Sequence, residues 1–98
     1  MTFNEIREKI IENKTNLKSF GVKKIGFFGS HVRNEATIES DIDIIVVFEE
    51  GKKSFDNFMD LHESLESLYG EKIDLVTKES ISKYILPYIE EEAVYEEL

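Results

Sequence analysis

The chain has 98 residues, contains no Cys, and carries 12 Lys and Arg against 21 Asp and Glu, which gives a formal net charge of −9. This length predicts one domain over residues 1–98, and the absence of Cys excludes disulfides and thiolate metal sites. The negative charge argues against direct nucleic-acid binding, which depends on neutralising phosphates, and favours a basic protein partner. With neither a signal peptide nor a long apolar run, the chain is expected to be cytoplasmic and to stay out of the membrane.

The first part of the chain predicts a helix, a strand and a second, short helix. Residues 2–20 carry an apolar stripe at helical spacing, and Thr2 with Glu5 forms a capping box. Residues 22–28 predict a strand that ends at Gly29-Ser30. Residues 31–36 predict a short helix, and residues 37–40 a loop. The stripe of the first helix consists of Phe3, Ile6, Ile10, Leu17 and Phe20.

The rest of the chain predicts two strands around a long helix, followed by shorter elements. Residues 41–48 are nearly all apolar after the second acid and predict the most buried strand. Residues 54–69 predict a helix, and residues 71–77 a third strand. Residues 78–86 predict a short helix that Pro87 ends, residues 87–91 a further helical turn, and residues 93–96 an edge strand. The core stripe expected in the long helix is Phe55, Phe58, Leu61, Leu65 and Leu68. These elements predict an α+β fold.

Two acids, Asp41 and Asp43, open the second strand. Because a strand alternates its faces with period 2, their carboxylates point the same way. Such residues lie roughly 7 Å apart, so at an effective dielectric of about 20 their repulsion costs about 2 kcal/mol. A divalent cation would turn this repulsion into binding, and Mg²⁺ is typically held by carboxylates together with substrate phosphates. The alternative interpretation is two solvated acids at the start of a strand.

A Gly-Ser turn precedes the first acid by ten intervening residues. Gly29 allows the backbone to approach a ligand closely, and exposed N–H groups at a helix start favour anions. The Ser30 hydroxyl could bind a phosphate oxygen, and Arg33, three residues later, could face the same ligand. An ordinary turn followed by a surface Arg is the alternative.

A third acid, Asp74, lies inside the apolar run of the third strand. It shares a face with Lys72 and Val76, whereas Ile73 and Leu75 point to the other side. If this strand pairs beside residues 41–48, Asp74 can meet the other two acids across the sheet.

The combination Gly29-Ser30, ten residues, and Asp41-x-Asp43 resembles the signature of the DNA polymerase β-like nucleotidyltransferases, and in particular of their minimal nucleotidyltransferase (MNT) proteins. Residues 72–76 are similar to the family's strand that carries the third carboxylate. One departure is Asn34, where a Gly is usual. The resemblance implies the DNA polymerase β-like nucleotidyltransferase fold, a small mixed sheet flanked by helices. It also extends to Arg33, Glu35, Ala36 and Ser40.

A Gly-Ser turn with three convergent carboxylates suits metal-assisted nucleotidyl transfer, in which two Mg²⁺ ions are held by Asp41, Asp43 and Asp74. In this hypothesis Gly29, Ser30 and Arg33 bind phosphate oxygens, and Asp74 helps to deprotonate the acceptor. The resemblance adds ATP as the substrate. It also implies an antitoxin that transfers AMP to a tyrosine of a HEPN-domain RNase toxin.

We therefore expect an adenylyltransferase that forms a hetero-oligomer with its partner or a homo-oligomer. One alternative is a small-molecule nucleotidyltransferase, as in aminoglycoside modification. Another is a non-catalytic antitoxin that acts by complex formation alone.

Overall fold

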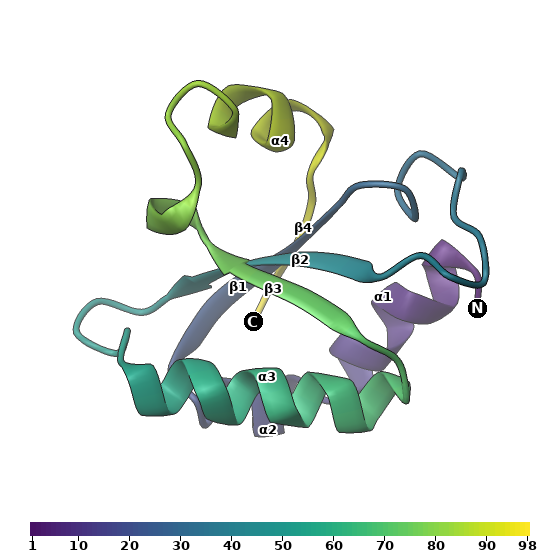
Figure 1. The fold of residues 1–98 in the computed structure, drawn as a ribbon. Helices are drawn as coiled ribbons and strands as arrows, with labels where there is room; N and C mark the ends of the chain where they lie inside the picture. Colours follow the sequence, from purple (N-terminus) through teal and green to yellow (C-terminus); the bar gives the residue numbers. More distant parts are fainter.

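The computed structural model describes residues 1–98 and contains a four-stranded sheet with helices on both sides, so the expected α+β fold is confirmed (Figure 1). None of its helices combines the length and the apolar character needed to cross a membrane. In chain order the elements are α1 (Phe3–Glu12), α2 (Lys14–Lys18), β1 (Val22–Phe28), β2 (Ile42–Phe48), α3 (Phe55–Tyr69), β3 (Ile73–Thr77), the 3₁₀ helix η1 (Lys78–Ser80), α4 (Leu86–Glu92) and β4 (Val94–Glu97).

The sheet is mixed, with the strand order β3-β2-β1-β4. Strand β1 is antiparallel to both β2 and β4, whereas β2 and β3 are parallel. The central position of β2 explains its nearly continuous apolar sequence, because strands covered on both sides bury both faces. Strand β4 forms the edge predicted for the C-terminus, and the Leu98 N–H extends it by donating to the Lys23 carbonyl at 3.0 Å.

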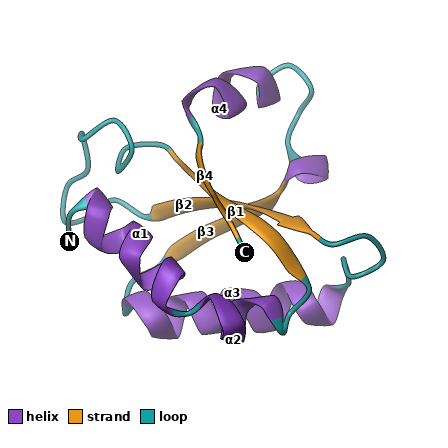
Figure 2. Cartoon of the chain, turned by 180° about the vertical axis from the view of Figure 1, so that it is seen from behind, coloured by secondary structure: helices purple, strands orange, loops and turns teal.

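Helices α1, α2 and α3 lie on one face of the sheet, and α4 lies on the other (Figures 1 and 2). Ile42 and Ile44 of β2 and Ile73 of β3 belong to the core that faces the three helices. Because strand residues alternate, Asp43 and Asp74 point toward the face that carries α4. The core cluster comprises Ile6, Ile10, Leu17, Val22, Ile25, Phe27, Ile42, Ile44, Val46, Leu61, Leu65, Tyr69, Ile73 and Leu75.

The first helix is broken, so the prediction of one helix over residues 2–20 is wrong. The break lies at Asn13, with φ −114° and ψ 17°. Its side-chain amide donates to the Lys9 carbonyl at 2.7 Å, so its backbone N–H donates to the Ile10 carbonyl instead. The side chain thus takes the acceptor that a continuous helix would need. Thr2 does form the predicted capping box with Glu5.

The short helix predicted for residues 31–36 is absent, and turns replace it. The N–H groups of Val32 and Arg33 both donate to the Gly29 carbonyl at 3.2 Å. Asn34 then adopts φ +59°, in the left-handed region, which ends any helical progression. Asn tolerates this conformation better than most residues other than Gly.

The helix predicted for residues 78–86 is reduced to η1, and the regular helix α4 begins only at Leu86. Pro87 therefore does not end a helix, but the helical turn predicted for residues 87–91 is present as part of α4. It lies in the first turn of α4, where a residue without an N–H is tolerated because that group has no helical partner.

Helix α3 matches its predicted bounds, with Ser54 as N-cap and Gly70 in the left-handed conformation at its end. Leu61 and Leu65 are fully buried, as predicted. Phe55 is the exception, because 77% of its surface is exposed and it lines an open groove with Phe58 instead of entering the core.

Candidate active site

Three neighbouring strands, β1, β2 and β3, place Gly29, Asp43 and Asp74 in a row across the sheet, near one end of these strands. In the strand pairing, Phe28 lies opposite Asp43, and Asp43 lies opposite Asp74. Gly29 follows directly after the last residue of β1. The parallel pairing of β2 and β3 thus brings together two acids that are far apart in the sequence.

The Gly29 turn and the Asp43 side chain are in direct contact. Gly29 has φ +81°, and a Cβ added at this position would lie 2.1 Å from Asp43 Oδ2. Two non-bonded atoms cannot approach this closely, and the positive φ disfavours any other residue as well. Only glycine therefore lets the Asp43 carboxylate lie against the backbone of this turn.

The surroundings of Asp43 oppose its negative charge. Partial burial, together with the nearby charges of Asp74 and Asp41, raises the pKa of Asp43 to about 6, while Arg33 acts in the opposite direction. A group of like charges with this much repulsion attracts cations.

Asp74 is exposed on the same face, and Asp41 lies one residue before β2, not within the predicted strand. The side chain of Asp41 is 40% exposed, and its Oδ2 lies 3.9 Å from the Nζ of Lys72. No three His, Cys, Asp or Glu side chains converge closely enough to hold a metal ion on their own. The acids therefore form an open set of oxygen ligands, which suits a hard cation that takes its remaining ligands from phosphate and water.

A carboxylate from the end of α4 occupies the Gly-Ser turn. Glu92 Oε1 accepts a hydrogen bond from the Gly29 N–H at 2.5 Å. The Nη1 of Arg33 donates to both oxygens of the same carboxylate, at 3.0 and 3.1 Å. Ser30 lies between these two donors in the sequence and is partly buried. The hydrogen bond from Gly29, with that from Arg33, lowers the pKa of Glu92, so the group is an anion at neutral pH.

Sequence analysis did not identify Glu92. It belongs to a run of three Glu at residues 90–92, which reads as a solvated face. Its position follows from the register of β1 and β4, in which Phe27 lies opposite Val94. Gly29 lies two residues after Phe27 and Glu92 two residues before Val94, so the same antiparallel register brings them together.

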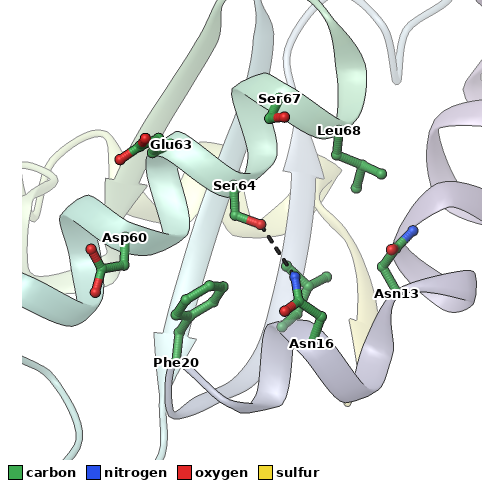
Figure 3. Close-up of a pocket in the computed structure, with 9 residues that line it drawn as sticks. Asn13, Asn16, Phe20, Asp60, Glu63, Ser64, Ser67 and Leu68 are labelled. Carbon is green, nitrogen blue, oxygen red and sulfur yellow. Dashed lines mark hydrogen bonds between the residues drawn. The ribbon is translucent and has the colours of Figure 1, made fainter.

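The largest cavity in the structure, about 520 Å³, lies elsewhere, between α2 and α3 (Figure 3). It belongs to the helical layer, on the opposite side of the sheet from α4. Asp60 and Glu63 project at its rim, and the Asn16 amide donates to Ser64 Oγ at 3.4 Å. Two acids and no basic side chain make this groove a poor site for phosphates. It is lined by Asn13, Asn16, Leu17, Phe20, Asp60, Glu63, Ser64, Ser67 and Leu68.

Comparison with known proteins supports the family resemblance that Gly29-Ser30 and Asp41-x-Asp43 indicate. The family model described as "Nucleotidyltransferase domain" matches residues 5–96. The chain is 44% identical over 96 residues to the protein adenylyltransferase MntA of Thermococcus cleftensis, covering 97% of this chain and 96% of that one. It is 45% identical over 97 residues to a provisionally named protein adenylyltransferase of Methanocaldococcus jannaschii, covering 96% and 97% of the two chains.

Solved structures share the fold. One, provisionally described as a minimal nucleotidyltransferase, superposes with a TM-score of 0.82 at 28% identity and covers 96% of this chain and 95% of its own. Another, a toxin–antitoxin crystal structure with AMP-PNP, has a TM-score of 0.68 at 24% identity over 90% of this chain and 69% of its own. The resemblance inferred from Gly29-Ser30 and Asp41-x-Asp43 is confirmed at the level of the family.

Proposed function

The chain belongs to the nucleotidyltransferase domain family, and we propose that it transfers AMP from ATP to a hydroxyl group of a partner protein. The observation that carries the proposal is the row of Gly29, Asp43 and Asp74 on three adjacent strand ends. This row places a backbone N–H that can bind phosphate beside two paired carboxylates that can bind a cation. A protein acceptor is supported by the relatives that are named protein adenylyltransferases.

The phosphates of ATP would be bound by the Gly-Ser turn. In this proposal the Gly29 N–H and the Ser30 hydroxyl would donate to phosphate oxygens. The Arg33 guanidinium, whose Nη1 already donates to both oxygens of a carboxylate, can donate to phosphate oxygens as well. These contacts would fix the orientation of the triphosphate relative to the acids.

Asp41, Asp43 and Asp74 would hold Mg²⁺, two ions in the proposed mechanism. All available donors are carboxylate oxygens, and the raised pKa of Asp43 reflects repulsion that a cation relieves. Bound Mg²⁺ supplies charge neutralisation for the attacking and leaving oxygens of an in-line displacement. The residues fit this role because they form an open set that leaves positions for phosphate oxygens.

In the transfer itself, the acceptor hydroxyl oxygen forms a bond to the α-phosphorus of ATP. The bond from the α-phosphorus to the oxygen that bridges to the β-phosphorus breaks, and diphosphate leaves. Asp74, which is exposed, would accept the hydroxyl proton. No residue of the site acts as a covalent nucleophile, so catalysis rests on positioning and electrostatics.

The acceptor that fits best is a tyrosine of a HEPN-domain RNase toxin, which would make this chain an antitoxin. The relative at 44% identity is named MntA, and one structure with the same fold comes from a toxin–antitoxin complex. The net charge of −9 suits a basic partner. The competing functions are transfer to a small hydroxyl compound and neutralisation by complex formation alone.

Intact-mass measurement of the protein encoded by the neighbouring gene tests this proposal. After incubation with the chain, ATP and Mg²⁺, the partner should gain one or more AMP units. Asp43→Asn should abolish the gain, whereas the control Asp60→Asn, an exposed acid on α3, should not. Neutralisation that persists with Asp43→Asn and without any mass gain would support the masking function instead.

A further inference from the structure

The groups that would bind phosphate in the proposed function are already bound to a carboxylate of the same chain. Glu92 accepts hydrogen bonds from the Gly29 N–H and, through both of its oxygens, from Arg33. Backbone N–H groups and a guanidinium are donors that also recognise phosphate oxygens. The Glu92 carboxylate therefore offers this turn negatively charged oxygen acceptors, as a phosphate group would.

This contact differs from an ordinary surface ion pair. Gly29 is buried, and the Glu92 side chain is only 28% exposed. The neighbouring pair between Lys78 and Glu90, at 3.0 Å, involves no backbone donor and lies on the more exposed side of α4. Of these two acids of α4, only Glu92 reaches the candidate active site.

We propose that Glu92 is an internal substitute for a nucleotide phosphate and must leave the Gly-Ser turn before the triphosphate of ATP can bind. The inference rests on the proposed function, because it assigns Gly29 and Arg33 to phosphate binding. A carboxylate and a phosphate cannot use the same N–H and the same guanidinium at one time. The free protein is thus held in a state that competes with its substrate.

The chain can release Glu92 without unfolding. Glu92 is the last residue of α4, and Ala93 after it belongs to neither the helix nor β4. Helix α4 keeps its contact between Lys78 and Glu90, and β4 stays paired with β1. Rotation of one side chain is therefore sufficient, and the apparent affinity for ATP is lowered by the fraction of molecules in which Glu92 is bound.

Glu92→Gln tests the proposal, with Glu91→Gln as the matched control. Both changes remove one negative charge from the end of α4, but Glu91 is exposed. Isothermal titration calorimetry with ATP and Mg²⁺ should show about tenfold tighter binding for Glu92→Gln, because a neutral amide competes less well for Arg33 and Gly29. Glu91→Gln should bind ATP like the wild type.

A second measurement separates release of the turn from a general charge effect. Without nucleotide, Glu92→Gln should melt at a lower temperature than the wild type, because the turn loses its internal partner, and Glu91→Gln should not. Tighter binding together with lower stability is the expected signature. Glu92→Asp, which keeps the charge on a shorter side chain, should also bind ATP more tightly and provides the test if the Gln variant does not fold.

Unchanged or weaker ATP binding by the Glu92 variants, with normal binding by the wild type, would overturn this inference and leave the proposed function intact. Failure of ATP to bind to the wild type and to all variants would overturn both.

Discussion

Replacing Asp43 by Asn should stabilise the metal-free protein at neutral pH while it abolishes nucleotidyl transfer. In the folded chain, burial and the charges of Asp74 and Asp41 disfavour an ionised Asp43, and its pKa rises from 3.8 to about 6. Asn keeps the size of the side chain and removes the charge. A residue that weakens the fold in this way, yet is needed for cation binding, is expected at an active site.

The magnitude follows from the pKa difference. About two pKa units correspond to about 3 kcal/mol for a group shielded from water. Because Asp43 is only partly buried, solvent screening reduces this figure to about 1 kcal/mol. For a chain of this size, 1 kcal/mol raises the melting temperature by about 4–8 °C.

The pH dependence has a definite sign. The folded-state pKa of Asp43 lies above its unfolded value of about 3.9, so the folded state binds more protons between about pH 4 and pH 6. The free energy of unfolding of the wild type therefore falls as pH rises through this window, and the loss is complete above the folded pKa. Asp43→Asn should lack this contribution.

Urea unfolding at several pH values between about 4 and 8, with EDTA present, measures both effects. The control Asp60→Asn removes an exposed charge and should change the free energy of unfolding by less than about 0.5 kcal/mol. If Asp43→Asn were less stable than the wild type at pH 8, or showed the same fall with pH, the electrostatic description of this site would be wrong.

Two further predictions concern the turn and the core, and urea unfolding checks both. Gly29→Ala should lower the free energy of unfolding by about 2–4 kcal/mol, because it adds a clash with Asp43 to the strain of a positive φ. The control Gly51→Ala, with φ +78° and no atom within 4 Å, should lower it by only about 1 kcal/mol. Equal losses would show that Gly29 and Asp43 are not in contact. Leu65→Ala, at a fully buried position, should cost about 2–5 kcal/mol, and Phe55→Ala, at an exposed one, less than about 0.5 kcal/mol. A large loss for Phe55→Ala would place that ring in the core.

The strands and the long helix were predictable because their signals are local. In β2 and β3, Asp43 and Asp74 each lie between two apolar residues, so period 2 assigns the acids to one face and their neighbours to the other. The break at Asn13 has no such local signal in the sequence. Ile10 and Leu17 lie two helical turns apart, and both stay buried although the helix between them is interrupted. Hydrophobic periodicity therefore cannot report the competition of a side-chain amide for the backbone.

The arrangement of the site was predictable only in part. From the sequence, Asp43 and Asp74 could be predicted to meet only on the condition that their strands lie side by side. Glu92 could not be found, because its approach to Gly29 depends on how the last strand pairs with the first. Asn34 shows a third case, because its backbone adopts the left-handed conformation within the segment for which the sequence predicted a short helix.

The central claim is that this site transfers a nucleotidyl group, and the position of a label in ATP tests it most directly. The chain and its partner protein are incubated with Mg²⁺ and ATP that carries the label either on the α-phosphate or on the γ-phosphate. The account predicts that the partner is labelled only from the α-phosphate and that the label is lost with Asp43→Asn. Labelling from the γ-phosphate would instead reveal phosphoryl transfer and contradict the account.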